Sequence, residues 1–396
     1  MAGKTEGAPK GINTRLAHMG HNPHDFHGFV NPPIYRGSTI LFPDAQTMAT
    51  RDQKYTYGTL GTPTHTALEN AVNELESSAG TVLVPSGLAA VTLPLLAYAE
   101  AGTHMLFTDA IYFPARRFAD TMLTKMGVEV EYYEPTIGAD IERLMRPNTR
   151  VVWTEAPASN TFEMQDISAI AAVAKAHGAV TMMDNTYATP LFFKPLDHGV
   201  DISIHAATKY PAGHADILLG MISANENAWG RIHAAYVDLG ICAHPEDVYL
   251  VLRGMRTMGI RLQRHEVSTL DVSSWLQGQK GVRTVLNPAL PGDPGHTLFK
   301  RDFCGSTSVF SIVLDGTGDE NKDKAKAHAF LNTLKLFGLG YSWGGYESLA
   351  VHVWLGDRTV SRRDYGGPVI RLQIGLEDTV DLKEELERAL AAADAV

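Results

Sequence analysis

The chain reads MMDNTYATPLFFKPLDHGVDISIHAATKY from residue 182 to residue 210, and this stretch decides the fold. It holds two short apolar strands, one ending at Asp184 and the other leading into Thr208 and Lys209. Where such strands form a parallel sheet, ligands bind at their carboxyl ends. We therefore expect Asp184 and Lys209 to lie at one ligand site, at the edge of an α/β sheet.

The two ionisable residues suggest a chemistry. A lysine buried at a strand end loses hydration, so its pKa falls and its neutral amine can form a Schiff base with a carbonyl. A nearby aspartate could keep a pyridine nitrogen protonated and so make that ring an electron sink. A plain salt bridge between Asp184 and Lys209 is an equally simple interpretation, and the spacing alone leaves both open.

The same alternation continues on both sides of this stretch. Helical patterns cover residues 64–77 and 166–177, and the second begins with Asp166, a typical helix start, and stops at Gly178. Strands alternating with helices indicate βαβ units and a mostly parallel sheet. The predicted strands are residues 81–84, 104–108, 128–133, 150–155, 179–184 and 202–205.

Changes in composition and in the pattern of strands and helices along the chain predict three parts. Residues 1–60 are rich in proline and polar residues, and we expect an irregular arm that contacts a neighbouring subunit. Residues 61–255 form the large α/β domain, and residues 256–396 a smaller α+β domain. We expect one helix over 250–275, strands over 308–314 and 369–374, and a last helix over 382–393.

Composition excludes several classes of partner. The 34 Lys and Arg against 44 Asp and Glu give a formal charge of −10, which disfavours nucleic acids and anionic membranes. The uncharged stretch 77–99 is broken by Pro85, Gly87 and Pro94, so we expect a buried strand, a turn and a helix, not a membrane span. Two cysteines without a CxxC pair and a polar N-terminus predict a cytoplasmic protein.

Two smaller patterns carry less weight. VPSGLAAV, residues 84–91, has the order strand, small-residue turn, helix, so the backbone near Gly87 could bind a phosphate, although many such turns bind nothing. Histidines recur every third residue in the arm, but Pro23 interrupts any helix and no carboxylate cluster completes a ligand set. No metal site is therefore expected at these histidines, which are His18, His21, His24 and His27.

Several segments resemble the Cys/Met-metabolism family of pyridoxal 5'-phosphate (PLP) enzymes, over about residues 11–390. Within this family, YSWGGYESL and IRLQIGLED are most similar to the cystathionine β-lyases. The other segments are TEAPASNTFEMQDI, the stretch from residue 182 to 210, and RGMRTMGIRL. The resemblance implies an aspartate-aminotransferase-like fold (fold type I) with a seven-stranded sheet, and a homotetramer whose active sites are shared across a dimer. It also implies cleavage of L-cystathionine, a small sulfur amino acid, to homocysteine, pyruvate and ammonia.

The resemblance assigns roles to particular side chains. Lys209 would carry the cofactor and move the Cα proton, and Asp184 would bind the pyridine nitrogen. Arg371 would bind the substrate carboxylate, in a subsite lined by Ser342 and Trp343. The remaining cofactor contacts would be Tyr112 stacked on the ring and aiding proton transfer, Ser159 near the ring hydroxyl, and Gly87, Leu88, Thr208 and a neighbouring subunit's Tyr57 at the phosphate.

Some positions depart from the family pattern. Thr59 and Leu60 stand where relatives have a phosphate-binding arginine and, in some β-lyases, a second arginine for the distal end of the substrate. Ser159 replaces a common asparagine, and Ala206 a common serine. Cystathionine γ-synthase, methionine γ-lyase and a PLP-binding regulator without catalysis therefore stay open as alternatives. A nicotinamide oxidoreductase is disfavoured because no GxGxxG follows an early strand.

Overall fold

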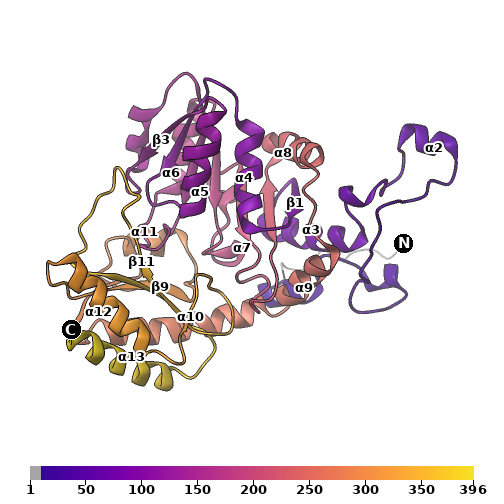
Figure 1. Ribbon diagram of the computed structural model, residues 1–396. Coiled ribbons are helices and arrows are strands. Elements are labelled where there is room, and N and C mark those ends of the chain that lie inside the picture. Colours follow the sequence, from indigo (N-terminus) through magenta and orange to yellow (C-terminus); the bar gives the residue numbers. More distant parts are fainter. Residues whose placement is uncertain (1–9) are drawn as a thin grey trace.

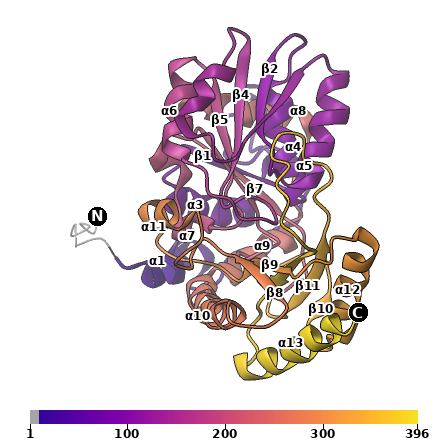
Figure 2. The same cartoon turned by 90° about the vertical axis from the view of Figure 1, so that its left-hand side faces the viewer.

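The computed structural model describes residues 10–396, which contain two sheets, one above the other in Figure 2. The larger has seven strands in the order β1-β7-β6-β5-β4-β2-β3. All pairs from β6 to β3 are parallel, whereas β7 runs antiparallel to β1 and β6. The strands are β1 (Gly80–Val84), β2 (His104–Thr108), β3 (Glu129–Tyr133), β4 (Thr149–Glu155), β5 (Val180–Asp184), β6 (Ile202–Ala206) and β7 (Gly220–Ala224). The predicted seven-stranded, mostly parallel sheet is thus confirmed.

Helices cover both faces of this sheet. Apolar side chains of α4, α5 and α8 pack on one face, and those of α3 and α6 on the other. Burial on both faces explains why the strands read as continuous apolar runs in the sequence. Asp166 caps α6 as predicted, since its carboxylate accepts the N–H of Ala169 at 3.1 Å. The helices are α3 (Pro63–Glu76), α4 (Gly87–Tyr98), α5 (Phe113–Phe118), α6 (Ile167–Ala176), α7 (Thr189–Phe192) and α8 (Glu226–Leu239).

The helix expected over 250–275 is wrong as a single element, because α9 (Pro245–Met255) ends and α10 (Met258–Leu276) begins within it. Two arginines stabilise the break. Arg256 donates to the carbonyl of Leu16 at 2.7 Å. Arg261 donates at 2.8 Å to the carbonyl of Gly254, which also accepts the backbone N–H of Thr257 at 3.1 Å. Side-chain donors thus add to the tighter backbone bonds where α9 ends.

The second sheet has five strands in the order β10-β11-β12-β9-β8. It packs on α10, α12 and α13 through its own apolar core, which confirms a smaller C-terminal α+β part. The strands expected over 308–314 and 369–374 are present, whereas β8, β10 and β11 were not predicted. The elements are β8 (Val282–Leu286), α11 (His296–Asp302), β9 (Val309–Leu314), α12 (Glu320–Thr333), β10 (Gly338–Leu339), β11 (Leu349–Val353), β12 (Val369–Gln373) and α13 (Thr379–Asp394).

The N-terminal segment divides into an anchored and a projecting part. Leu16 on α1 (Ile12–His18) and Met19 are buried in the core that contains α10. The segment around α2 (Ala45–Thr50) projects from the body in Figure 1. It exposes apolar side chains, among them Phe29, Val30, Leu41 and Met48. The contact of this segment with a neighbouring subunit stays a prediction, as do the domain boundaries at residues 60 and 255.

Within residues 10–396, no helix is both long and apolar enough to cross a bilayer.

Candidate active site

A cavity of about 640 Å³ lies at the carboxyl ends of β4, β5 and β6, next to the five-stranded sheet. Both sheets contribute to its lining, because Arg371 belongs to β12 of the smaller sheet. The structure brings together all but one of the site residues expected from the sequence, and Tyr57 is the exception. Those in the lining are Gly87, Leu88, Tyr112, Ser159, Asp184, Thr208, Lys209, Ser342, Trp343 and Arg371.

Lys209 follows β6 and points into this cavity. Its Nζ donates to Ser342 Oγ at 2.7 Å and lies 5.2 Å from the centre of the Trp343 ring. Burial first, and then the positive charge of Arg371, lower the Lys209 pKa from 10.5 to about 8, and Asp184 opposes this shift. Among the ion pairs of the described residues none joins Lys209 to Asp184, so the simple salt-bridge interpretation is wrong.

A glycine allows the smaller sheet's segment to approach this lysine. Gly344 has φ +86°, and a Cβ there would lie 3.1 Å from the carbonyl carbon of Lys209. Only glycine adopts this conformation readily and leaves room for the neighbouring backbone. The sequence Trp343-Gly344-Gly345 therefore packs directly on the chain that carries the amine.

Two carboxyl groups lie side by side at the ends of β4 and β5, where Glu155 pairs with Asp184. Asp184 accepts the backbone N–H of Thr186 at 3.0 Å, and Glu155 accepts that of Tyr112 at 2.8 Å. Burial raises the pKa of Asp184, although hydrogen bonds from Thr186 oppose this shift. The pKa of Glu155 lies well above its usual range, mainly because the group is buried and also because Asp184 is negatively charged. Sequence reasoning missed Glu155, although it ends a predicted strand at the ligand-binding edge.

The start of α4 forms one corner of the cavity, with backbone N–H groups that no intrahelical bond uses. Ser86 caps this helix by accepting the N–H of Ala89 at 3.1 Å, while the N–H groups of Gly87 and Leu88 precede the first intrahelical bonds. Gly87 is required because a Cβ there would lie 2.5 Å from the Cβ of Ala206. Thr208 also lines the cavity here, so the donors suit a phosphate group.

Arg371 forms the opposite end of the cavity. Its Nη1 donates to Asn160 Oδ1 at 3.1 Å, and its Nη2 donates to the carbonyl of Tyr341. Burial lowers the Arg371 pKa to about 10, and the charges of Tyr112 and Tyr210 oppose that shift. A guanidinium so held suits a carboxylate ligand. Sequence reasoning missed Asn160, although it directly follows Ser159, where the family's asparagine was expected.

The arm does not reach this cavity within the chain described. Tyr57 is half exposed and pairs with Thr39 in an isolated bridge, and the carbonyl of Thr59 accepts the hydroxyl of Tyr236 at 3.3 Å. Arg51 and Lys54, the basic residues nearest to Thr59 along the chain, are also absent from the lining. A contribution of Tyr57 to a neighbouring subunit stays a prediction.

Comparison with known proteins gives a consistent assignment. The family described as "Cys/Met metabolism PLP-dependent enzyme" matches residues 13–391. A Rhizobium johnstonii protein, provisionally named a cystathionine beta-lyase, is 63% identical over 98% of this chain and 97% of its own length. The L-alanine/L-glutamate racemase of Wolbachia pipientis is 40% identical over 95% and 96% of the two chains.

A solved structure of metB from Corynebacterium glutamicum superposes with a TM-score of 0.88 at 28% identity, and covers 96% of this chain and 98% of its own. The family match covers nearly the whole chain, including both sheets and the cavity between them. The chain belongs to the Cys/Met-metabolism family of PLP-dependent enzymes.

Proposed function

We propose that the protein is a carbon–sulfur β-lyase that cleaves L-cystathionine to homocysteine, pyruvate and ammonia. The observation that supports this most directly is one cavity that contains a lysine amine with a pKa of about 8 and the half-buried guanidinium of Arg371. Such a pair suits an α-amino acid, whose carboxylate needs a cation and whose Cα–H needs a base. The provisional name of the 63% identical relative supports the same reaction.

The residues of the cavity fit PLP. The corner at Gly87 and Leu88 would bind its phosphate together with Thr208, and Asp184 would hold its pyridine nitrogen. Asp184 has no ion-pair partner within the described chain, so its buried carboxyl is available for a cationic ring nitrogen. Tyr112 would stack on the ring, and its backbone is held by Glu155. When bound, PLP supplies a carbonyl for the substrate amine and a ring that delocalises negative charge from Cα.

The side chains of the protein then orient the substrate and move its protons. Arg371, held by Asn160 and Tyr341, binds the α-carboxylate and fixes the direction of the Cα–H bond. The Nζ of Lys209, neutral in a large fraction of molecules near pH 8, takes the Cα proton. The same Nζ, now positively charged, is the donor that protonates the departing sulfur. Ser342 keeps this amine directed into the cavity through its bond of 2.7 Å.

One competing activity has a specific observation in its favour. A racemase at 40% identity over nearly the whole chain indicates that this scaffold also serves proton transfer at Cα without loss of a sulfur group. Both activities begin with removal of the Cα proton, so they differ only in the later steps, where a β-lyase expels sulfur and a racemase returns a proton to Cα. γ-Elimination or γ-replacement is the other alternative, and it differs in the carbon that loses its substituent.

Product analysis of the purified PLP-loaded protein tests the proposal. With L-cystathionine, we expect pyruvate and homocysteine in equal amounts, since the Cβ–S bond breaks. Formation of 2-oxobutyrate and cysteine would indicate γ-elimination, and D-alanine from L-alanine without pyruvate from cystathionine would indicate a racemase. Either result contradicts the β-lyase assignment.

The same proposal includes a cytoplasmic homotetramer in which Tyr57 contacts the cofactor of a neighbouring subunit. The molecular mass in solution tests the tetramer, and Tyr57→Phe tests the contact.

A further inference from the structure

The loop between β11 and β12, residues 354–368, crosses from the smaller sheet to the edge of the larger one, as the gold segment of Figures 1 and 2 shows. The buried carboxylate of Asp109, which follows β2, accepts the backbone N–H groups of Thr359, Val360 and Ser361 at 3.1, 2.9 and 2.6 Å. Burial raises the Asp109 pKa, but these bonds outweigh it and the pKa is lowered. The loop is therefore docked by a charged group.

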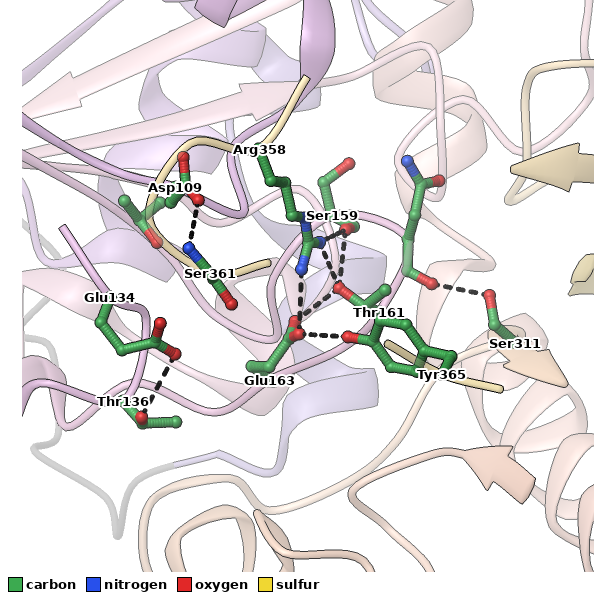
Figure 3. A network of polar contacts seen from close by, with 12 residues as sticks. Asp109, Glu134, Thr136, Ser159, Thr161, Glu163, Ser311, Arg358, Ser361 and Tyr365 are labelled. Carbon is green, nitrogen blue, oxygen red and sulfur yellow. Dashed lines mark hydrogen bonds and ion pairs between the residues drawn. The ribbon is translucent and has the colours of Figure 1, made fainter. Parts of the chain in front are cut away.

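Arg358 extends from this loop into the turn at residues 158–163, as seen in Figure 3. The side chain of Arg358 is 5% exposed, and its guanidinium forms an ion pair with Glu163 Oε1 at 3.0 Å. It also donates to the carbonyl of Ser159 at 3.3 Å and to the hydroxyl of Thr161. One side chain of the smaller sheet's loop thus joins the beginning and the end of a turn that follows β4.

The turn needs such support because two of its residues have unusual backbone angles. Asn160 has φ +65° and Phe162 has φ +60°, a region that residues other than glycine occupy only when their surroundings hold them there. Ser311 holds the turn from the other side by donating to the carbonyl of Asn160 at 2.7 Å. The Asn160 side chain contacts Arg371, so the turn's conformation sets the position of that contact.

We propose that Arg358 is a positioning residue that holds the 158–163 turn so that Asn160 orients Arg371 for a carboxylate. Arg358 itself is not among the residues that line the cavity, so it acts through the turn and does not touch the substrate. This inference rests on the proposed role of Arg371. It predicts an effect on ligands that carry a carboxylate and none on small amines that lack one.

The test uses the PLP-loaded enzyme with Arg358→Met, and Arg362→Met as the matched control, since Arg362 is an exposed arginine of the same loop. Binding of L-alanine, followed by the cofactor absorption spectrum, measures the carboxylate-dependent step. Reaction with hydroxylamine, which has no carboxylate, measures access to the cofactor alone. For Arg358→Met we expect the alanine Kd and the substrate KM to rise about 5- to 20-fold. The hydroxylamine rate should change less than about twofold, and Arg362→Met should resemble the parent protein.

A second pair of variants separates positioning from general loss of structure. Asn160→Gly removes the amide while keeping a residue that tolerates φ +65°. If Arg358 acts through Asn160, adding Arg358→Met to Asn160→Gly should raise the alanine Kd by less than about twofold more. Independent effects that multiply would overturn the proposal, as would an equal loss of hydroxylamine reactivity.

A milder variant covers the case in which Arg358→Met does not fold. Tyr365 donates to Glu163 Oε1 at 2.8 Å, so Tyr365→Phe removes one bond from the same cluster without leaving a charge unpaired. For Tyr365→Phe we expect the alanine Kd to rise about two- to threefold, and an unchanged Kd would contradict the proposal.

Arg371→Ala shows whether a failure concerns the carboxylate site itself or only the positioning role of Arg358. If it leaves alanine binding unchanged, the proposed carboxylate site is wrong; if it abolishes binding while Arg358→Met has no effect, only the positioning role is wrong.

Discussion

The two sheets supply different parts of the cavity and do so in different ways. The seven-stranded sheet contributes strand ends and one helix start, at Asp184, Lys209 and Gly87. The five-stranded sheet contributes Arg371 from the middle of a strand and Ser342 from an irregular segment. The first set owes its position to the regular geometry of parallel βαβ units, and the second to contacts between distant parts of the chain.

This difference has a functional counterpart in the proposed mechanism. Groups on the larger sheet face the cofactor, whose shape does not change from one substrate to another. Arg371 on the smaller sheet faces the substrate, and the loop at residues 354–368 acts on Arg371 only through the turn at residues 158–163. Substitutions in the first set should therefore remove the chemistry, and substitutions in the second should change which ligand is bound and how tightly.

The largest effect is expected at Lys209. Lys209→Ala removes the base and the cofactor attachment together, so turnover should fall about 10³-fold or more. The absorption band of protein-linked cofactor should also disappear. Lys280→Ala is the control, because Lys280 is almost fully exposed and pairs with Asp394 far along the chain. Retained turnover in Lys209→Ala would refute the assignment of this amine.

Arg371 tests the role of the smaller sheet in binding the substrate. Arg371→Ala should lower kcat/KM about 10²-fold, because a half-buried cation that pairs with the substrate carboxylate is lost. Cofactor affinity should change by less than about threefold, since cofactor contacts belong to the other sheet. Arg283→Ala on β8 of the same sheet is the control, as Arg283 is half exposed. If cofactor affinity falls as much as substrate affinity, the division between the two sheets is wrong.

The same difference explains what the sequence could predict. Strand ends follow from local patterns, so the meeting of Asp184 and Lys209 in one cavity was predictable, whereas the place of Gly87 in that cavity was implied by the family resemblance. The strand at residues 220–224 was not, because a short antiparallel strand without a preceding helix breaks the alternation that identified the others. The single helix over 250–275 failed for a related reason, since the carbonyl acceptors for Arg256 lie some 240 residues away in α1 and just after it.

Within the site, the missed residues depend on long-range contacts. Asn160 contacts Arg371, which is 211 positions away, and the carbonyl of the preceding Ser159 accepts a bond from Arg358 in a loop of the other sheet. No periodicity in the sequence encodes such a contact. Glu155 is the exception, since it ends a predicted strand and could have been found by the rule that identified Asp184.

The pH dependence of cofactor attachment tests the pKa of the Lys209 amine, to which residues of both sheets contribute. A lysine amine is a nucleophile only when deprotonated, and the pKa of Lys209 is about 8. The rate at which the cofactor-free protein takes up PLP should therefore rise about tenfold per pH unit below 8 and level off above it. A lysine with the ordinary value of 10.5 would show no plateau near 8. Because Arg371 contributes to the lowering, Arg371→Ala should move the plateau to higher pH, whereas Arg283→Ala should leave it in place.

The smallest effect is expected in the projecting segment, which belongs to neither sheet. Thr59→Arg introduces the cation that the family resemblance led us to expect near Tyr57. If the segment reaches a neighbouring subunit's phosphate corner, PLP should bind about threefold or more tightly, because a guanidinium adds a charge-assisted bond to the phosphate. Thr50→Arg is the control, since it adds the same charge to an exposed position of the same segment. The gain should depend on assembly and vanish at protein concentrations where the oligomer dissociates. A gain equal in both variants would reflect net charge alone, and no gain would mean that Thr59 does not face the cofactor.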